Sequence, residues 1–252
     1  IQPPEWIGTG NFTSLGKDTY FKTSVINTAI YTAIVVPIQT VFAVVLANLI
    51  ATFCRDKFGN FIKSSLFIPV ISSMILVGVI WRIMLGTESG IINNLLGIFG
   101  ISGLNWLGDK YLAMISISIV SIWKNVGYFL VIYYAGIMDI PKSYYEAAKV
   151  DGASHLQQFR YITLPSLKPI TFLVVTLGTI WSFQVFDLVY VMTGGGPGTS
   201  TLTLVLYIYQ TAFKQFNMGY ASAISIILLL LILVVSGLQN LLFREKNAKG
   251  GS

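Results

Sequence analysis

Charged residues, cysteine and histidine are all scarce in this sequence, and each scarcity excludes a class of protein. Only 10% of the 252 residues are charged, whereas soluble domains carry about 25%. The single cysteine, Cys54, excludes an internal disulfide. The single histidine, His155, excludes a bis-histidine haem or a multi-histidine metal site within the chain. We therefore expect neither a respiratory redox subunit nor a metalloenzyme, and no cofactor in this chain.

Apolar sequence is abundant instead: 54% of the residues are hydrophobic and the mean hydropathy is +0.73. A helix needs about 20 apolar residues to cross hydrocarbon roughly 30 Å thick. Runs of this length, none alternating as barrel strands do, lie near Ser24–Phe53, Ile62–Leu85, Tyr111–Met138, Ile170–Met192 and Tyr220–Phe243. The pattern predicts an all-α, polytopic transmembrane helical bundle over residues 24–243.

The basic residues predict the orientation of this bundle, because Lys and Arg collect on the cytoplasmic side. Ten of them lie in the links after the first and third runs and in the C-terminal segment: Arg55, Lys57, Lys63, Lys142, Lys149, Arg160, Lys168, Arg244, Lys246 and Lys249. The opposite links hold Lys17, Lys22, Lys110 and Lys214. The net charge of +6 therefore reflects topology and indicates no nucleic-acid partner.

The two ends of the chain lead to separate predictions. Residues 1–23 are polar and fall outside the cytoplasm in this orientation, although no span or signal peptide precedes them. We therefore expect either an earlier span upstream or an N-terminus that is translocated unaided. Residues 244–252 are expected to form a cytoplasmic tail, in which Lys249-Gly250-Gly251-Ser252 resembles an expression linker.

Residues 140–169, between the third and fourth runs, predict two short helices joined by a tight bend. Pro141 suits a first helical position, and Gly152 can adopt the left-handed conformation that ends a helix. Ser154 and Gln157 have the spacing of a capping box, and Pro165 is expected to stop the second helix.

The second of these helices carries an apolar stripe, because Leu156, Phe159 and Ile162 recur at three-residue spacing. A cytoplasmic stripe flanked by Glu146 and Asp151 suits docking into a groove on a soluble partner. It suits equally well a connector that packs on the ends of its own spans, so local physics leaves both interpretations open.

The segment Glu146-Ala147-Ala148-x-x-Asp151-Gly152-Ala153, followed by Phe159-x-x-Ile162-x-Leu164-Pro165, resembles the EAA loop of ABC importer permeases that depend on a binding protein. The resemblance implies the transmembrane-domain fold of type I ABC importers. It also implies that the loop fits a cleft on an ATPase subunit, which binds ATP and Mg. The residues carried over to this coupling role are Glu146, Ala147, Ala148, Asp151, Gly152, Ala153, Phe159, Leu164 and Pro165.

A second resemblance concerns the branch of that family. The glycine-rich stretch Met192–Thr201, with Leu206–Gln210 after it, is similar to the larger partner of the maltose-type pair of carbohydrate permeases. Glu5–Gly8 looks like the segment that follows the first span there, which would place a sixth span before Ile1. The glycines lack the Lys-Ser/Thr of a phosphate loop, so we expect a turn that leads into a re-entrant or interfacial segment at 202–216.

Polar residues inside two predicted spans are candidates for the substrate pathway, because sugar recognition requires hydrogen-bonding groups and aromatic faces. They are Ser121, Trp123, Lys124, Asn125, Tyr128, Ser182, Gln184 and Asp187. Polar packing between helices is the alternative for each. A direct pair of Lys124 with Asp187 would have to bridge about 12 Å of depth, which disfavours it. Arg82 is interpreted as snorkelling to the interface, and Pro37 and Pro69 as kinks.

These features predict a permease subunit of an ATP-binding-cassette importer for a sugar or oligosaccharide, without catalytic activity of its own, in the bacterial cytoplasmic membrane. The expected partners are a second homologous permease, two ATPase subunits and an extracytoplasmic solute-binding protein. The alternative is an ion-coupled secondary transporter, although no second copy of any segment is found, as its internal repeats would require.

Overall fold

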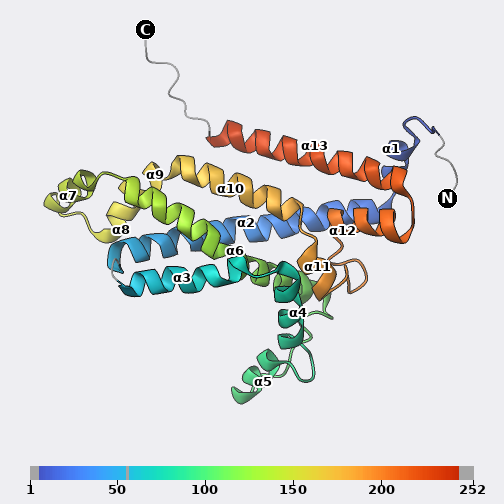
Figure 1. Ribbon diagram of the computed structural model, residues 1–252, viewed down its shortest axis with the longest axis horizontal. Helices are drawn as coiled ribbons and strands as arrows, with labels where there is room; N and C mark the ends of the chain where they lie inside the picture. Colours follow the sequence, from blue (N-terminus) through green and yellow to red (C-terminus); the bar gives the residue numbers. More distant parts are fainter. Residues whose placement is uncertain (1–5, 55–56, 244–252) are drawn as a thin grey trace, which may run out of the picture. The chain divides into compact units, whose positions relative to one another are not determined.

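The computed structural model describes residues 6–54 and 57–243, and the regular structure in these ranges is helical throughout (Figure 1). Predictions that fall on residues 1–5, on Arg55 and on the tail 244–252 lie outside the described residues. The elements are α1 (Gly10–Leu15), α2 (Thr19–Phe53), α3 (Lys57–Ile71), α4 (Met74–Met84), α5 (Ile91–Ile98), α6 (Lys110–Asp139), α7 (Lys142–Val150), α8 (His155–Gln158), the π-helix η1 (Phe159–Thr163), α9 (Leu164–Ser166), α10 (Lys168–Phe183), α11 (Asp187–Met192), α12 (Leu204–Tyr209), the π-helix η2 (Gln210–Lys214) and α13 (Met218–Phe243).

The chain forms two compact units. Unit 1 contains the described parts of residues 1–34, 73–120 and 181–234, and unit 2 those of residues 35–72, 121–180 and 235–252. Helices α2, α6, α10 and α13 contribute residues to both units.

The predicted spans are partly continuous and partly broken. Among the described residues, α2, α6 and α13 are each long and apolar enough to cross a membrane. Up to five spans result if two bent pairs, α3 with α4 and His155–Ser166 with α10, each count as one. The three matching predictions are therefore confirmed. The predicted second run is divided between α3 and α4, and the predicted fourth run between α10 and α11.

The second run breaks at Ser72 and Ser73 for a local reason. Pro69 lies inside α3 and has no amide to donate to the carbonyl of Ser65, which weakens the last turns of this helix. The Ser72 amide donates back to the Pro69 carbonyl (3.2 Å), and Ser73 at φ −59° and ψ 133° then starts α4. Pro37, by contrast, lies within α2, which runs on past it.

The fourth run breaks at residues 184–186, which include neither proline nor glycine. The carbonyl of Val185 is freed there and accepts a hydrogen bond from Thr203 Oγ1 at 3.2 Å. A non-helical backbone at membrane depth requires such a partner. Because Thr203 is distant in sequence, hydropathy alone predicted one unbroken helix, and that prediction is wrong.

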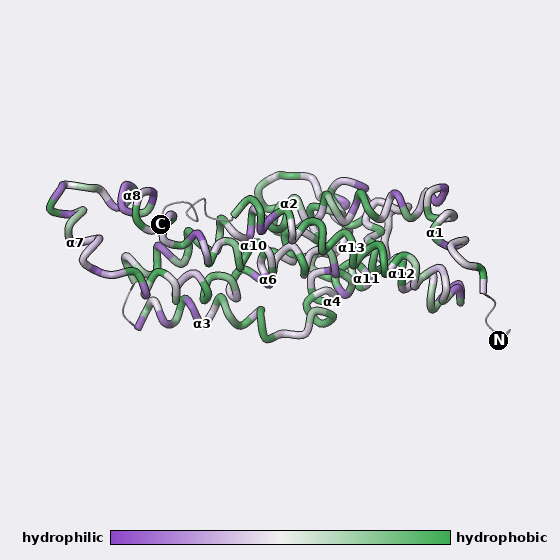
Figure 2. The backbone as a smooth tube through the Cα atoms, turned by 90° about the horizontal axis from the view of Figure 1, so that it is seen from above, coloured by the Kyte–Doolittle hydropathy of each residue, from purple (hydrophilic) through white to green (hydrophobic). Residues whose placement is uncertain are grey.

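The core of unit 2 is formed where α2, α6 and the start of α10 pack closely. Ala43, Ala47 and Ala51 recur every four residues on α2 and are almost fully buried. On α6, a Cβ at Gly136 would collide with the side chain of Ile170, so the glycine allows the close approach. Figure 2 shows hydrophobic colour along α13 and mostly hydrophilic colour on α7 and α8.

In unit 1, α11 packs against α4, and hydrogen bonds hold α5 in place. Helix α11 lies against α4, where a Cβ at Gly78 would be 3.2 Å from Val191. Helix α5, which was not predicted, is held by Asn93. This buried side chain accepts from Trp106 Nε1 (2.8 Å) and donates to the carbonyls of Thr87 and Leu104.

Candidate functional site

The predicted bend at Gly152 is a Schellman motif at the end of α7. The Ala153 amide donates to the Ala148 carbonyl (2.8 Å) and the Gly152 amide donates to the Lys149 carbonyl (3.1 Å). Gly152 has φ +77°, the left-handed conformation that a Cβ disfavours. The predicted role of this glycine in the backbone is confirmed.

The second helix of the loop begins as predicted. The Gln157 amide donates to Ser154 Oγ (3.3 Å), and the Ser154 amide donates to Gln157 Oε1 (2.7 Å), which together form a capping box. Helix α8 continues through η1 into α9, which contains Pro165 and ends at Ser166. The helix therefore ends one residue beyond the predicted stop.

The apolar stripe of that helix divides between two environments. Leu156 is 74% exposed, whereas Phe159 and Ile162 are half-buried and pack against the core of unit 2. The π-helical turn η1 adds a residue per turn, so a three-residue spacing does not stay on one face. The three residues therefore do not form one stripe, and the connector interpretation holds for Phe159 and Ile162, whereas docking of the loop stays a prediction.

The predicted coupling residues surround this bend in unit 2. Glu146, Ala147, Asp151, Gly152, Leu164 and Pro165 are exposed, and Ala148, Ala153 and Phe159 are half-buried. Sequence reasoning missed Val150 and Tyr161, which are 88% and 70% exposed. Exposed apolar side chains on such a loop are compatible with a surface for a protein partner.

The loop is fastened to the helices beneath it. Tyr145 Oη of α7 and Thr163 Oγ1 of η1 share a hydrogen bond of 2.9 Å, and Thr163 is buried. Gln158, also buried, donates to the Ala153 carbonyl at 2.9 Å. These contacts make α7, the bend and η1 one connected element.

The substrate-pathway candidates on α6 lie in unit 2 and differ in exposure. Ser121 and Lys124 are buried, Asn125 and Tyr128 are half-buried, and Trp123 is exposed. Asn125 Nδ2 donates to Ser121 Oγ at 3.4 Å. Lys124 Nζ donates to the Val70 carbonyl at 3.2 Å, in the last turn of α3. A cation at a helix C-terminus is stabilising, so Lys124 has a structural partner where the second run breaks.

The candidates on the fourth run lie in unit 1. Ser182 is buried, Gln184 is exposed, and Asp187 is the half-buried first residue of α11. Arg82 Nη1 donates to the Val191 carbonyl at 3.3 Å near the end of α11. It therefore contacts a helix terminus, which the snorkelling interpretation did not include.

An aromatic cluster in unit 1 was missed at the sequence level. The Phe186 ring lies 5.3 Å from Tyr190 and 5.1 Å from Tyr209 between centroids, and Phe213 lies 5.5 Å from Tyr209. The Lys214 ammonium is 5.9 Å from the centre of the Tyr190 ring. The four-residue spacing of Tyr209 and Phe213 was the signal in the sequence that could have indicated this cluster. Their association with the fourth run depends on the fold, so the sequence alone did not predict it.

The glycine-rich stretch is a hydrogen-bonded turn, as predicted. Thr193 Oγ1 and Thr201 Oγ1 are 2.7 Å apart and tie its two ends together. Asn27 of α2 donates to the carbonyls of Thr199 (2.7 Å) and Leu202 (3.0 Å). The following segment contains α12 and η2, and its re-entrant character stays a prediction.

Fold and site together define a multi-pass helical membrane protein that presents an exposed two-helix loop suited to a protein partner. The chain belongs to the family described as "Binding-protein-dependent transport system inner membrane component", which matches residues 21–247. This membership decides against the ion-coupled secondary transporter considered from the sequence.

Relatives and a solved structure agree with this assignment. The chain is 37% identical over 237 residues to the arabinooligosaccharides transport system permease protein AraP of Bacillus subtilis, covering 92% of this chain and 74% of that protein. It is 35% identical over 244 residues to the lactose transport system permease protein LacF of Rhizobium radiobacter, covering 95% and 81%. A bacterial ABC transporter that imports the acidic polysaccharide alginate has the same fold, with a TM-score of 0.88, 23% identity and coverage of 96% and 85%.

Proposed function

We propose that this chain is a permease subunit of an ATP-binding-cassette importer of the bacterial cytoplasmic membrane, with a sugar or oligosaccharide as its cargo. The observation that carries the proposal is the exposed α7–α8 loop, whose bend at Gly152 displays Glu146 and Asp151. An extracytoplasmic solute-binding protein would deliver the cargo.

The loop would act as the coupling element for ATPase subunits. These partners would bind ATP and Mg and carry out the hydrolysis, while this chain and a second homologous permease form the pathway. Phe159 and Ile162 pack on the core of unit 2, and Tyr145 bonds to Thr163. Displacement of α7 by an ATPase would therefore be transmitted to α2 and α6, as alternating access requires.

The cargo class is supported by the relatives, whose names specify arabinooligosaccharides, lactose, and trehalose or maltose. Within unit 2, the polar groups on α6 are of the kind that form hydrogen bonds with sugar hydroxyls. Asn125 and Gln184 are the candidates that we assign to cargo contact, since neither is buried.

Reconstitution of the chain with its partner subunits in vesicles tests the proposal. We expect uptake of a labelled oligosaccharide to require ATP, the solute-binding protein and this chain together. Uptake without ATP and driven by an ion gradient would overturn it.

The cargo contacts have their own test. Asn125→Leu and Gln184→Leu should each lower the initial rate of uptake more than basal ATP hydrolysis, because a lost hydrogen bond to a polar cargo costs about 1 kcal/mol or more. Asn94→Leu, at an exposed position on α5, is the matched control. Unchanged uptake in the double variant would remove both residues from the pathway.

A further inference from the structure

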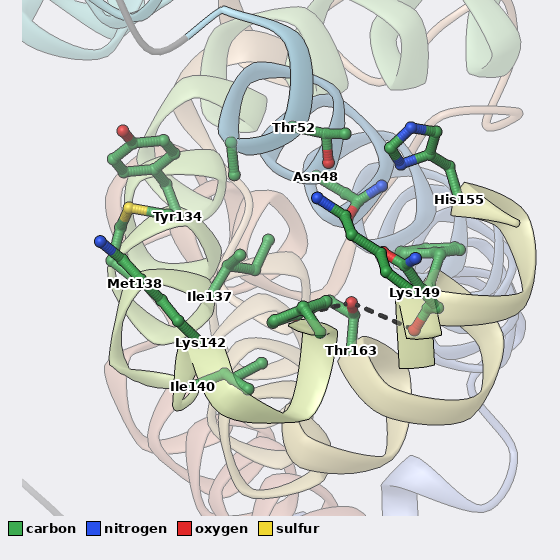
Figure 3. A pocket seen from close by; sticks show the side chains of 14 residues that line it. Asn48, Thr52, Tyr134, Ile137, Met138, Ile140, Lys142, Lys149, His155 and Thr163 are labelled. Atoms are coloured by element: carbon green, nitrogen blue, oxygen red, sulfur yellow. Dashed lines mark hydrogen bonds between the residues drawn. The ribbon is translucent and has the colours of Figure 1, made fainter. Parts of the chain in front are cut away.

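A pocket of about 520 Å³ lies beneath the α7–α8 loop, entirely within unit 2. Figure 3 shows Lys149 and His155 approaching this coupling-loop pocket from the loop, while Asn48 and Thr52 face it from α2. Its volume is in the range of small-molecule sites.

The lining of the coupling-loop pocket is basic. Lys142, Lys149 and His155 line it, and none of the described residues that line it is acidic. The Lys63 ammonium lies 3.8 Å from the centre of the Tyr134 ring, and Tyr134 also lines the pocket. With hydroxyl and amide donors on the opposite wall, this chemistry fits a phosphate group.

An apolar groove on α3 and α6 begins beside the same lysine. Lys63, Phe67, Ile68, Ile71 and Val131 line this groove, whose volume is about 370 Å³. The residues on α3 recur every three to four positions, so the groove follows the helix for about 12 Å from Lys63. Ile68 and Ile71 are 61% and 75% exposed.

We propose that the coupling-loop pocket and this groove together bind an anionic phospholipid, with the headgroup phosphate among the lysines and one acyl chain along α3. A soluble phosphate would use the pocket alone, whereas the adjoining apolar groove requires a ligand with a hydrocarbon tail. Basic pockets at the cytoplasmic ends of membrane helices bind anionic headgroups in this way. The lipid would then contact α7 and affect the loop that we assign to ATPase coupling.

Native mass spectrometry of the purified chain with dioleoylphosphatidylglycerol in mixed micelles tests the site. Dioleoylphosphatidylcholine and glycerol 1-phosphate serve as the zwitterionic lipid and the free headgroup. We expect preferential retention of phosphatidylglycerol. Lys142→Gln with Lys149→Gln should weaken retention about fivefold per lysine, hence about 25-fold together.

Two matched controls distinguish lipid binding at this site from general effects of charge and apolar surface on lipid retention. Lys57→Gln with Lys168→Gln removes the same charge from exposed positions outside the pocket and should retain the lipid. Ile68→Ser should weaken retention of both lipids, whereas Ile38→Ser, an exposed isoleucine on α2, should not.

Three results would overturn the proposal: equal retention of the two lipids, equal loss in both lysine pairs, or binding of glycerol 1-phosphate as tight as that of phosphatidylglycerol. Circular dichroism establishes that each variant is folded. The proposed transport function is tested separately by ATP-dependent uptake, so either proposal can fail without the other.

Discussion

Asp18 makes the densest set of hydrogen bonds described for a carboxylate in unit 1. Its Oδ2 accepts from Tyr207 Oη (2.5 Å) and Tyr220 Oη (2.6 Å), and its Oδ1 accepts from the backbone amides of Tyr20 (2.8 Å) and Phe21 (3.1 Å). Burial raises the pKa of this carboxyl, but the two tyrosines and two amides together hold the pKa below its usual value of 3.8. One residue thus links the start of α2 to α12 and α13.

The lowered pKa predicts an acid-sensitive contribution to stability. Above the usual value of 3.8 the ionised Asp18 stabilises the folded chain fully, and this contribution is lost as pH falls through the lower pKa of the folded state. Asp18→Asn removes the charge and should lower the free energy of unfolding by roughly 2 kcal/mol at neutral pH. Thermal unfolding in detergent at neutral pH measures the loss.

Asp109 is the matched control for Asp18, because it also accepts two backbone amides, of Tyr111 and Leu112, at the start of a long helix. Asparagine caps a helix about as well as aspartate does, so Asp109→Asn should change stability little. Equal losses in the two variants would show that the tyrosine contacts of Asp18 add nothing.

At the scale of elements, α3 and α6 approach so closely that one glycine is required. A Cβ at Gly127 of α6 would collide with the backbone carbonyl oxygen of Leu66 in α3. Gly127→Ala should therefore destabilise the chain by about 1–3 kcal/mol through overpacking, measured as a lower midpoint of thermal unfolding. Gly97→Ala on α5, where a Cβ meets no atom within 4 Å, should cause no such loss. An unchanged midpoint in Gly127→Ala would mean that the two helices separate freely.

The contact of Lys124 with the end of α3 distinguishes a structural role from a role in cargo binding. Lys124→Met keeps the apolar stem but removes the ammonium that bonds to the Val70 carbonyl. We expect a lower unfolding midpoint, corresponding to about 1–3 kcal/mol for an unsatisfied partner, with an unchanged KM for uptake. A raised KM at an unchanged midpoint would instead return Lys124 to the substrate pathway.

Composition and hydropathy predicted the membrane helices well, because burial in hydrocarbon depends on residue type averaged over a window. The interruptions were harder to predict. The break at Val185 depends on Thr203, and the split of Leu156 from Phe159 depends on the π-helical turn η1. The bend at Gly152 was predictable because the Schellman motif and the capping box are set by neighbouring residues.

At the scale of the whole molecule, the sequence of the loop predicts the family, whereas the sequences of the membrane helices do not identify the cargo contacts. The motif around Glu146 and Gly152 was sufficient to predict the family, and the match over residues 21–247 confirms it. The candidate cargo contacts Asn125 and Gln184 are a half-buried and an exposed polar group, and their role stays a prediction. The sequence could not assign them, since the same residue types also serve in polar packing between helices.

The coupling of the loop to ATP hydrolysis provides the sharpest test of the assembled transporter. Gly152 has φ +77° and donates its amide to the Lys149 carbonyl. Proline fixes φ near about −65° and has no amide hydrogen, so Gly152→Pro should abolish cargo-stimulated ATP hydrolysis. Gly152→Ala keeps the amide and costs about 1–2 kcal/mol in the left-handed conformation, so it should give an intermediate rate.

Gly237→Ala on α13 is the control for these loop variants, because no atom lies within 4 Å of the added Cβ. Co-purification with the ATPase subunits separates failed docking from failed transmission. If Gly152→Pro still binds the ATPase and hydrolyses ATP at the cargo-stimulated rate of the unmodified transporter, then the bend does not couple the two processes. Loss of stimulation with retained membrane insertion, graded from alanine to proline, would place the coupling in the backbone geometry of this single position.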